Sequence, residues 1–284
     1  MLLHMLAREL YGLVKDTMDD WMEHNAHQLA AALAYYALFS IAPLVLIAIS
    51  IVGLVLGPEA ARAGVMDEIQ GLIGEKGAQG VEEMLEGLSD VKSNAVAGVL
   101  GLVLVLFGAT TVFTQLRSAL NTIWEAQPGT GGLVAGFVKD RLLSFALVVA
   151  IGFLLLVSLI MSTVLNAMGT FMTGFAPGSE GVWEGVNFIV SAAVVTVMFA
   201  LIYKFIPEAV IHWRDVWIGA LISALLFSVG KSLIGYYLGR SAVASAYGAA
   251  GAVVVLLIWV YYSSLLVLLG AEFTHVQATR WRRT

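Results

Sequence analysis

Six long apolar stretches with few or no charges inside them constrain this chain more than any other feature. The hydrocarbon core of a bilayer is about 30 Å thick, and a helix needs about 20 apolar residues to cross it. The stretches are continuously apolar rather than alternating, which favours helices over a barrel. They predict an all-α, polytopic membrane protein with six transmembrane helices, at residues 29–56, 95–115, 142–165, 186–206, 216–237 and 247–272.

The composition agrees with a lipid environment and excludes several classes of protein. Hydrophobic residues make up 60% of the 284 positions, and charged residues only 12%. The chain has no cysteine, which excludes disulfides, cysteine-ligated zinc and thiol nucleophiles. The net charge is −5, and Lys and Arg form no dense cluster, so we expect no nucleic-acid partner.

The distribution of basic residues predicts the side of the membrane on which the termini lie. With six spans, most of the 15 Lys and Arg residues fall on the side of the termini. The positive-inside rule then places both termini in the cytoplasm. The residues on that side are Arg8, Lys15, Arg117, Lys139, Arg141, Lys204, Arg214, Arg280, Arg282 and Arg283.

An amphipathic helix is predicted before the first span, in the cytoplasmic segment 1–28. Leu3, Leu6, Leu10, Val14 and Met18 recur at helical spacing and share one apolar face. We expect this helix to lie along the inner membrane surface or to dock onto the bundle. The transmembrane domain follows at 29–275, and a short basic cytoplasmic tail ends the chain at 276–284.

A second segment outside the spans, at 57–93, separates the first two of them. Two apolar patterns of helical spacing are divided by glycines, which predicts an extracytoplasmic helical hairpin. The segment is acidic, because its Asp and Glu residues outnumber its Lys and Arg residues. A solvated acidic loop is the alternative.

Three blocks of sequence occur in the order of a known family. They are AYYALFSIAP at 34–43, YKFIP at 203–207, and the stretch 247–272, which holds YGAAG, WVYYS and GAE. Together they resemble the YihY/BrkB family of bacterial inner-membrane proteins, which also carries a ribonuclease BN-like label. The resemblance implies six membrane helices, a bacterial cytoplasmic (inner) membrane location, and links to envelope lipid or lipopolysaccharide handling.

The residues themselves do not favour ribonuclease activity. A metal-dependent nuclease needs carboxylates or histidines gathered around one or two ions. His24 and His27 can share a helix face, but without a matched Glu or Asp in a buried setting this spacing is weak evidence for a metal. His212 and His275 are expected near membrane ends, where surface roles are usual. We therefore predict no catalytic residue, no metal site and no cofactor.

Polar side chains from five of the predicted spans are expected in the cytoplasmic half of the bundle. Such groups are costly in lipid unless they are paired or face water, so they predict a cavity open to the cytoplasm. Alternatively, hydroxyls bond to their own helix and basic side chains extend to the membrane surface. The predicted cavity residues are Tyr36, Ser40, Thr114, Gln115, Arg117, Arg141, Lys204, Tyr262 and Glu272.

Two further residues attract attention within the spans. Pro43 removes one hydrogen bond of its helix and releases the carbonyl of Phe39, which predicts a hinge; a static kink is the alternative. Lys231 lies near the outer end of the fifth span. We expect it either to contact an anionic group there or to extend to the membrane surface.

The leading functional hypothesis is a membrane transporter or lipid-translocating protein, not an enzyme, that moves an amphiphilic, anionic substrate through the cytoplasm-facing cavity. Arg117, Arg141 and Lys204 would form a positive entrance. Glu272 would pair with one of these bases or titrate as a coupling group. The alternative is a homo-oligomeric scaffold of envelope biogenesis, whose segment 57–93 binds an extracytoplasmic envelope protein. Membrane lipids are the expected partners in both cases.

Overall fold

The computed structural model describes residues 2–89, 111–126, 157, 180–240 and 251–283, and this part of the chain contains helices and turns but no strand. The prediction of an all-α fold is confirmed for it. A further helical segment covers residues 111–123. The other helices are α1 (Leu2–Glu23), α2 (Ala26–Leu56), α3 (Pro58–Ser89), α6 (Glu180–Phe205), α7 (Trp213–Arg240) and α9 (Gly251–Arg283).

Four helices in the described part are long and apolar enough to cross a membrane. They correspond to the first, fourth, fifth and sixth predicted spans. Most of the second predicted span and the whole third one, except for residue 157, lie outside the described residues, so the number of six spans stays a prediction. The four helical windows are Ala26–Leu56, Phe188–Phe205, Trp213–Gly230 and Gly251–Arg280.

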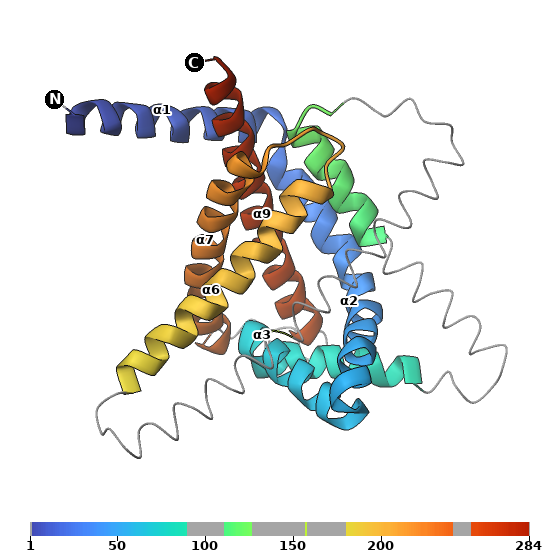
Figure 1. The fold of residues 1–284 in the computed structure, drawn as a ribbon. Helices are drawn as coiled ribbons and strands as arrows, with labels where there is room; N and C mark the ends of the chain where they lie inside the picture. The colour runs from blue at the N-terminus through green and yellow to red at the C-terminus, as the bar shows by residue number, and fades with distance from the viewer. Residues whose placement is uncertain (1, 90–110, 127–156, 158–179, 241–250, 284) are drawn as a thin grey trace.

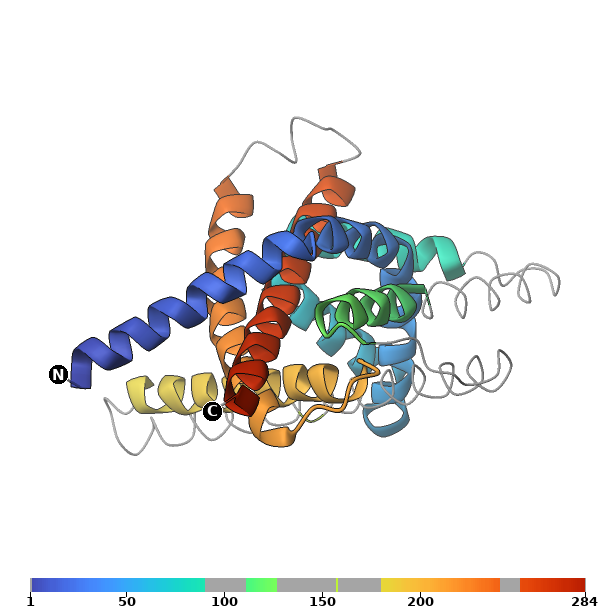
Figure 2. The same cartoon turned by 90° about the horizontal axis from the view of Figure 1, so that it is seen from above.

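Helix α9 occupies the centre of the described fold, where it packs against α1, α2, α3 and α7. Both termini lie at the same end of the molecule, and α3 lies at the opposite end (Figure 1). We call these the terminal end and the far end. Seen from above, the N-terminal half of α1 extends away from the other helices (Figure 2).

The crossing of α7 and α9 is close because glycines stand at the contact points. A Cβ atom on Gly270 would collide with the Ser223 hydroxyl and the Tyr203 hydroxyl, and one on Gly219 would collide with Thr274. The Tyr203 hydroxyl lies 2.8 Å from Ser223 Oγ and donates to the Val267 carbonyl at 2.8 Å. Small residues that allow backbones to approach are the usual means of helix association in lipid.

Helix α3 is a part of the packed structure and not a detached loop. It breaks at Gly74, whose φ of 77° is readily adopted only by glycine. Its buried residues Ile73, Val81 and Leu85 share an apolar cluster with Leu256 and Trp259 of α9. The alternative of a solvated loop is therefore wrong for residues 58–89, whereas the hairpin topology and the extracytoplasmic location stay predictions.

The amphipathic helix α1 has features of both predicted arrangements, docking onto the bundle and lying along the membrane surface. It packs on α9, and part of its apolar face remains exposed. Arg280 Nε of α9 donates to Asp16 Oδ2 at 3.0 Å. Val14, Met18 and Met22 are exposed, and such a row of apolar side chains suits the interfacial region of a bilayer. The predicted division of the chain into three parts stays a prediction.

Candidate functional site

A sharp corner between α1 and α2 places His24 at the terminal end. The chain turns at Asn25, which has left-handed backbone angles (φ 52°, ψ 42°), a conformation that asparagine adopts more readily than most residues. Ala26 and Ala30 are fully buried directly after the corner, so α2 packs closely from its first turn. His24 thereby lies against α9.

The partner of His24 on α9 is Glu272. His24 Nδ1 and Glu272 Oε1 are 2.9 Å apart, and the Glu272 side chain is 0% exposed. Its second oxygen, Oε2, has no hydrogen-bond partner among the residues that the structure describes. A buried carboxylate is costly unless its oxygens are bonded, so this half-satisfied group is the most unusual polar feature of the fold.

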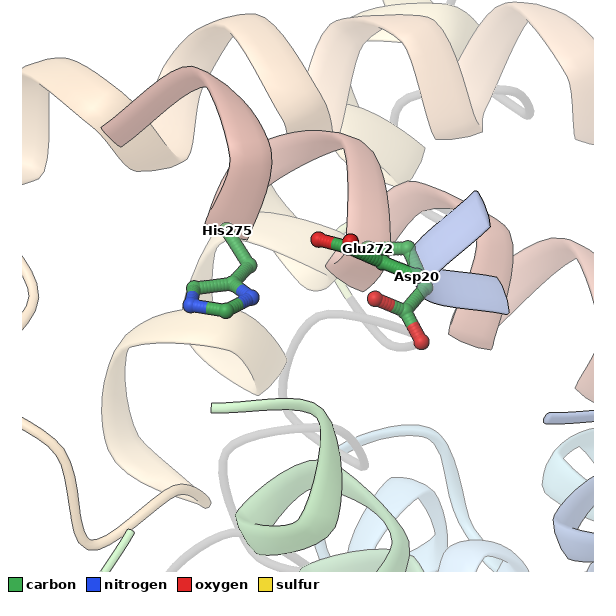
Figure 3. A group of neighbouring side chains, drawn as sticks. All are labelled: Asp20, Glu272 and His275. Carbon is green, nitrogen blue, oxygen red and sulfur yellow. The ribbon is translucent and has the colours of Figure 1, made fainter. Parts of the chain in front are cut away.

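Asp20 and His275 complete the immediate surroundings of Glu272. One ligand-type atom from each of Asp20, Glu272 and His275 lies within 4.8 Å of the other two. Figure 3 shows the three side chains. Helical spacing explains this arrangement, because Asp20 lies four residues before His24 and His275 lies three after Glu272. Burial raises the pKa of Asp20, and the imidazoles of His275 and His24 partly oppose this rise.

The segment 111–126 supplies a third side of the site. Glu125 Oε1 lies 4.0 Å from His24 Nε2, and the Trp124 and His275 ring centroids are 5.2 Å apart. Glu125 has a φ of 48°, and among the described residues only Asn25 shares a positive φ without being glycine. Strained backbone of this kind gathers at functional sites. We call Asp20, His24, Glu125, Glu272 and His275 the histidine–carboxylate cluster.

A cavity of about 180 Å³ adjoins the cluster. His275 and Trp124 line one part of it, so the cluster is reached from this space. The loop between α6 and α7 lines another part through Ala209 and Val210, and Ala278 and Thr279 of α9 complete the lining.

Two of the predicted basic residues lie around the same loop. Arg117 Nη2 pairs with Glu208 Oε1 at 3.2 Å, and the Glu208 backbone N–H donates to Asn121 Oδ1 at 2.8 Å. Lys204 donates to the Ile211 carbonyl and lies 5.7 Å from the centroid of the Trp213 ring. Neither base is the partner of Glu272, whose contact is to His24.

The remaining predicted cavity residues lie in other places. Ser40 is buried and donates to the Tyr36 carbonyl at 2.9 Å, within its own helix. Tyr262 lies over Gly230 of α7, and ten residues separate it from Glu272, which is about 15 Å along a helix. Thr114 is exposed and Gln115 half-buried. One cavity shared by all of the predicted residues stays a prediction.

The structure does not test three predictions on single residues: Arg141, Lys231 and Pro43. Arg141 and the side chain of Lys231 lie outside the described residues. Pro43 is buried inside α2, and the helix continues through it. Its role as a hinge stays a prediction.

Sequence reasoning found Glu272 but missed its surroundings. His24 was considered with His27, which is exposed, and His275 was considered alone. The useful signal was the spacing of unlike groups: an Asp four residues before His24 and a Glu three residues before His275 each put a carboxylate and an imidazole on one helix face.

The family model for the virulence factor BrkB matches residues 17–284, a range that includes the whole histidine–carboxylate cluster. This chain belongs to the BrkB family. The resemblance to YihY/BrkB proteins is thereby confirmed, and with it the assignment as a membrane protein. No solved structure matches the chain.

Curated relatives of this BrkB-family chain carry two kinds of name. The ribonuclease-like protein YfkH of Bacillus subtilis is 24% identical over 92% of this chain and 93% of its own length. A UPF0761 membrane protein of Ralstonia nicotianae is 32% identical over 64% of this chain and 39% of its own length. One of Teredinibacter turnerae is 29% identical over 93% of this chain and 60% of its own length. The chain thus spans nearly all of YfkH but less than two thirds of these two UPF0761 proteins.

Proposed function

We propose that this BrkB-family chain is a membrane transporter or lipid-translocating protein for an amphiphilic, anionic substrate, with the histidine–carboxylate cluster in its pathway. The observation that carries the proposal is the fully buried carboxylate of Glu272 on a helix able to span the membrane. Ionisable groups at such positions are costly, and they characteristically mark substrate or ion pathways.

The substrate class follows from the groups near the cavity. Arg117 and Lys204 supply positive charge around the α6–α7 loop, and the described helices carry many exposed large apolar side chains. Arg117 is paired with Glu208, whose side chain is 32% exposed. The Arg117 side chain itself is 16% exposed, so the pair is partly open to water and an anionic headgroup can compete with Glu208 for Arg117.

The same proposal includes the location. Both termini lie at one end of the molecule, as an even number of spans requires (Figure 1). The excess of basic residues on that side supports cytoplasmic termini in a bacterial cytoplasmic membrane. The cluster and its cavity would then open toward the cytoplasm.

Reconstituted vesicles test the proposal. A fluorescent phosphatidylglycerol and a fluorescent phosphatidylcholine are followed in proteoliposomes with wild type, Arg117→Gln or Arg62→Gln. Arg62 is the matched control, because it is an exposed arginine that pairs with Glu82 at 3.2 Å in α3. We expect wild type and Arg62→Gln to move the anionic lipid faster than empty vesicles, and Arg117→Gln to be slower by roughly tenfold, equivalent to 1.4 kcal/mol. Wild type that moves neither lipid faster than empty vesicles contradicts the proposal.

A role without catalysis is part of the proposal, although one relative carries a ribonuclease-like name. RNA carries many phosphates along its backbone, and Lys and Arg form no dense cluster in this chain that could bind them. We expect the purified protein to leave a labelled single-stranded RNA intact, with or without divalent ions. Cleavage that a Glu272→Gln variant abolishes would favour an enzyme.

A scaffold is the second candidate, and the surface of α3 favours it. Its apolar side packs on α9, and its outward side carries exposed acidic residues. These are Glu59, Asp67, Glu68, Glu75, Glu82, Glu83 and Glu86. A scaffold would bind a basic envelope protein at this surface. It would show no lipid transport in vesicles, and replacing these acids by neutral residues would abolish its function in cells.

A further inference from the structure

We propose that Asp20, Glu272 and His275 bind a divalent transition-metal ion, for which Zn²⁺ is the best-suited class. The inference concerns the protein in the absence of any substrate, so it does not rest on the transport proposal. The ion would link the surface helix α1 to the spanning helix α9, which supply the three ligands (Figure 3).

The donor set is one that such ions accept. Zn²⁺ binds imidazole nitrogen and carboxylate oxygen at about 2.0–2.2 Å, so ligand atoms around a tetrahedral ion lie roughly 3.5 Å apart. The three ligand-type atoms here lie within 4.8 Å of one another, so the side chains would rotate inward to bind an ion. Three protein ligands leave one position for water or another ligand.

An independent observation points to a cation at this place. Glu272 Oε2 is buried, belongs to a side chain with 0% exposure, and has no hydrogen-bond partner within the described part of the chain. Such an atom requires an explanation, and an ion is one of the usual ones. A bound cation would satisfy this oxygen without any change of the backbone.

Neighbouring side chains that would orient the ligands are also in place. His24 Nδ1 lies 2.9 Å from Glu272 Oε1, which fixes the carboxylate and leaves the other oxygen for the ion. His24 in turn faces Glu125 at 4.0 Å. Outer contacts of this kind orient metal ligands and increase their affinity.

The charges around the site favour a cation over an anion. Asp20, Glu125 and Glu272 contribute carboxylates, while the basic residue nearest on α9, Arg280, is bonded to Asp16. A divalent ion between these carboxylates would offset their mutual repulsion. The cavity of about 180 Å³ beside His275 supplies a route for the ion.

Calorimetric titration of the untagged, full-length protein in detergent tests the site directly. After removal of metals with a chelator, the protein is titrated with Zn²⁺, Mn²⁺ and Mg²⁺. We expect one saturable Zn²⁺ site, weaker Mn²⁺ binding and weakest Mg²⁺ binding. Asp20→Asn and His275→Ala should each weaken Zn²⁺ binding by more than about 100-fold, beyond the range of outer-shell changes. His27→Ala is the matched control and should bind as wild type, because His27 is exposed and lies outside the cluster.

X-ray absorption at the zinc edge of the wild type gives a second measurement that needs no variant. The expected spectrum has one imidazole and otherwise oxygen ligands. Wild type without saturable Zn²⁺ binding overturns the proposal, as does full affinity in a folded His275→Ala variant or a spectrum with several imidazoles. The titration contains no transported lipid, so a lack of Zn²⁺ binding does not bear on the transport proposal. A lack of lipid transport likewise does not bear on the metal site.

Discussion

At the scale of single residues, the environment of Glu272 is the main finding. Its carboxylate is buried in a helix able to span the membrane, and the contact to His24 is its one hydrogen bond among the described residues. We infer that His24 stabilises a group that the fold would otherwise exclude. His27, three residues later, is exposed and offers a matched comparison.

Replacement of His24 by alanine should destabilise the protein. The change leaves the Glu272 carboxylate buried without its partner, and loss of a hydrogen bond to a charged group costs about 1.5–3 kcal/mol. His27→Ala should change the free energy of unfolding by less than about 0.5 kcal/mol. Unfolding of both variants in detergent with a chelator present measures the difference, and equal stabilities would contradict the role of His24.

Some residues of the candidate site were predictable from the sequence, and their contacts were not. Glu272 and the bases Arg117 and Lys204 are predicted as functional from the sequence. Of the two predicted roles of Glu272, pairing with a base or titration as a coupling group, the described residues show neither; they show a contact to His24. This contact depends on the corner at Asn25, which turns α1 back against α9, and no local pattern in the sequence specifies that angle. Ser40 follows the alternative in which a hydroxyl bonds to its own helix.

At the scale of elements, glycine decides how closely the helices approach. Gly270 of α9 faces the hydroxyls of Ser223 and Tyr203, whereas Gly185 of α6 has no atom of the described residues near its Cβ position. Both glycines are helical, so a Gly→Ala change has the same effect on helix propensity at both positions. A difference in stability between the two variants then reports packing alone. The long apolar runs predicted these helices, but apolar composition alone does not reveal which faces meet.

Gly270→Ala should therefore disrupt the α7–α9 crossing, while Gly185→Ala should not. Overpacking typically costs about 1–3 kcal/mol, and alanine in an open helical position gains up to about 1 kcal/mol over glycine. The midpoint of thermal unfolding should fall for the first variant and remain equal or rise for the second. A Gly270→Ala protein as stable as wild type would show that the crossing is looser than described.

A second pair of glycines tests the break in α3. Gly74 has a φ of 77°, and Gly71 lies three residues earlier; an added Cβ would meet nothing at either position. Gly74 has a ψ of 172°, a combination that essentially only glycine adopts, so Gly74→Ala should lose about 1–3 kcal/mol from backbone strain alone, and Gly71→Ala should lose nothing. Hydrogen exchange of α3 in both variants measures this, and identical exchange would argue against a left-handed residue at 74.

At the scale of the whole molecule, α9 connects the two ends of the fold. It packs on α3 at the far end and carries Glu272 and His275 at the terminal end (Figures 1 and 3). The all-helical membrane fold was predictable, because lipid leaves few ways to satisfy the backbone. The assembly of the cluster from residues 20, 125 and 272 was not, since it depends on long-range packing.

The absence of cysteine makes the orientation directly measurable. Asp19 of α1 and Glu68 of α3 are exposed and lie on helices at opposite ends of the molecule (Figure 1). Single Asp19→Cys and Glu68→Cys variants in intact cells should react differently with an impermeant maleimide. We expect labelling at 68 without treatment and at 19 only after permeabilisation; the reverse result would invert the proposed topology.

The central claim is that the buried carboxylate at the terminal end serves a pathway rather than the fold alone. The most direct measurement is the rate at which Glu272→Gln moves fluorescent phosphatidylglycerol in proteoliposomes, compared with wild type and the exposed control Glu68→Gln. Glutamine keeps the shape of glutamate and can still bond to His24, so the fold should persist. We predict a rate at least about tenfold below wild type, equivalent to 1.4 kcal/mol, at an unchanged unfolding midpoint, with Glu68→Gln as fast as wild type. A Glu272→Gln protein that transports as fast as wild type would contradict the claim.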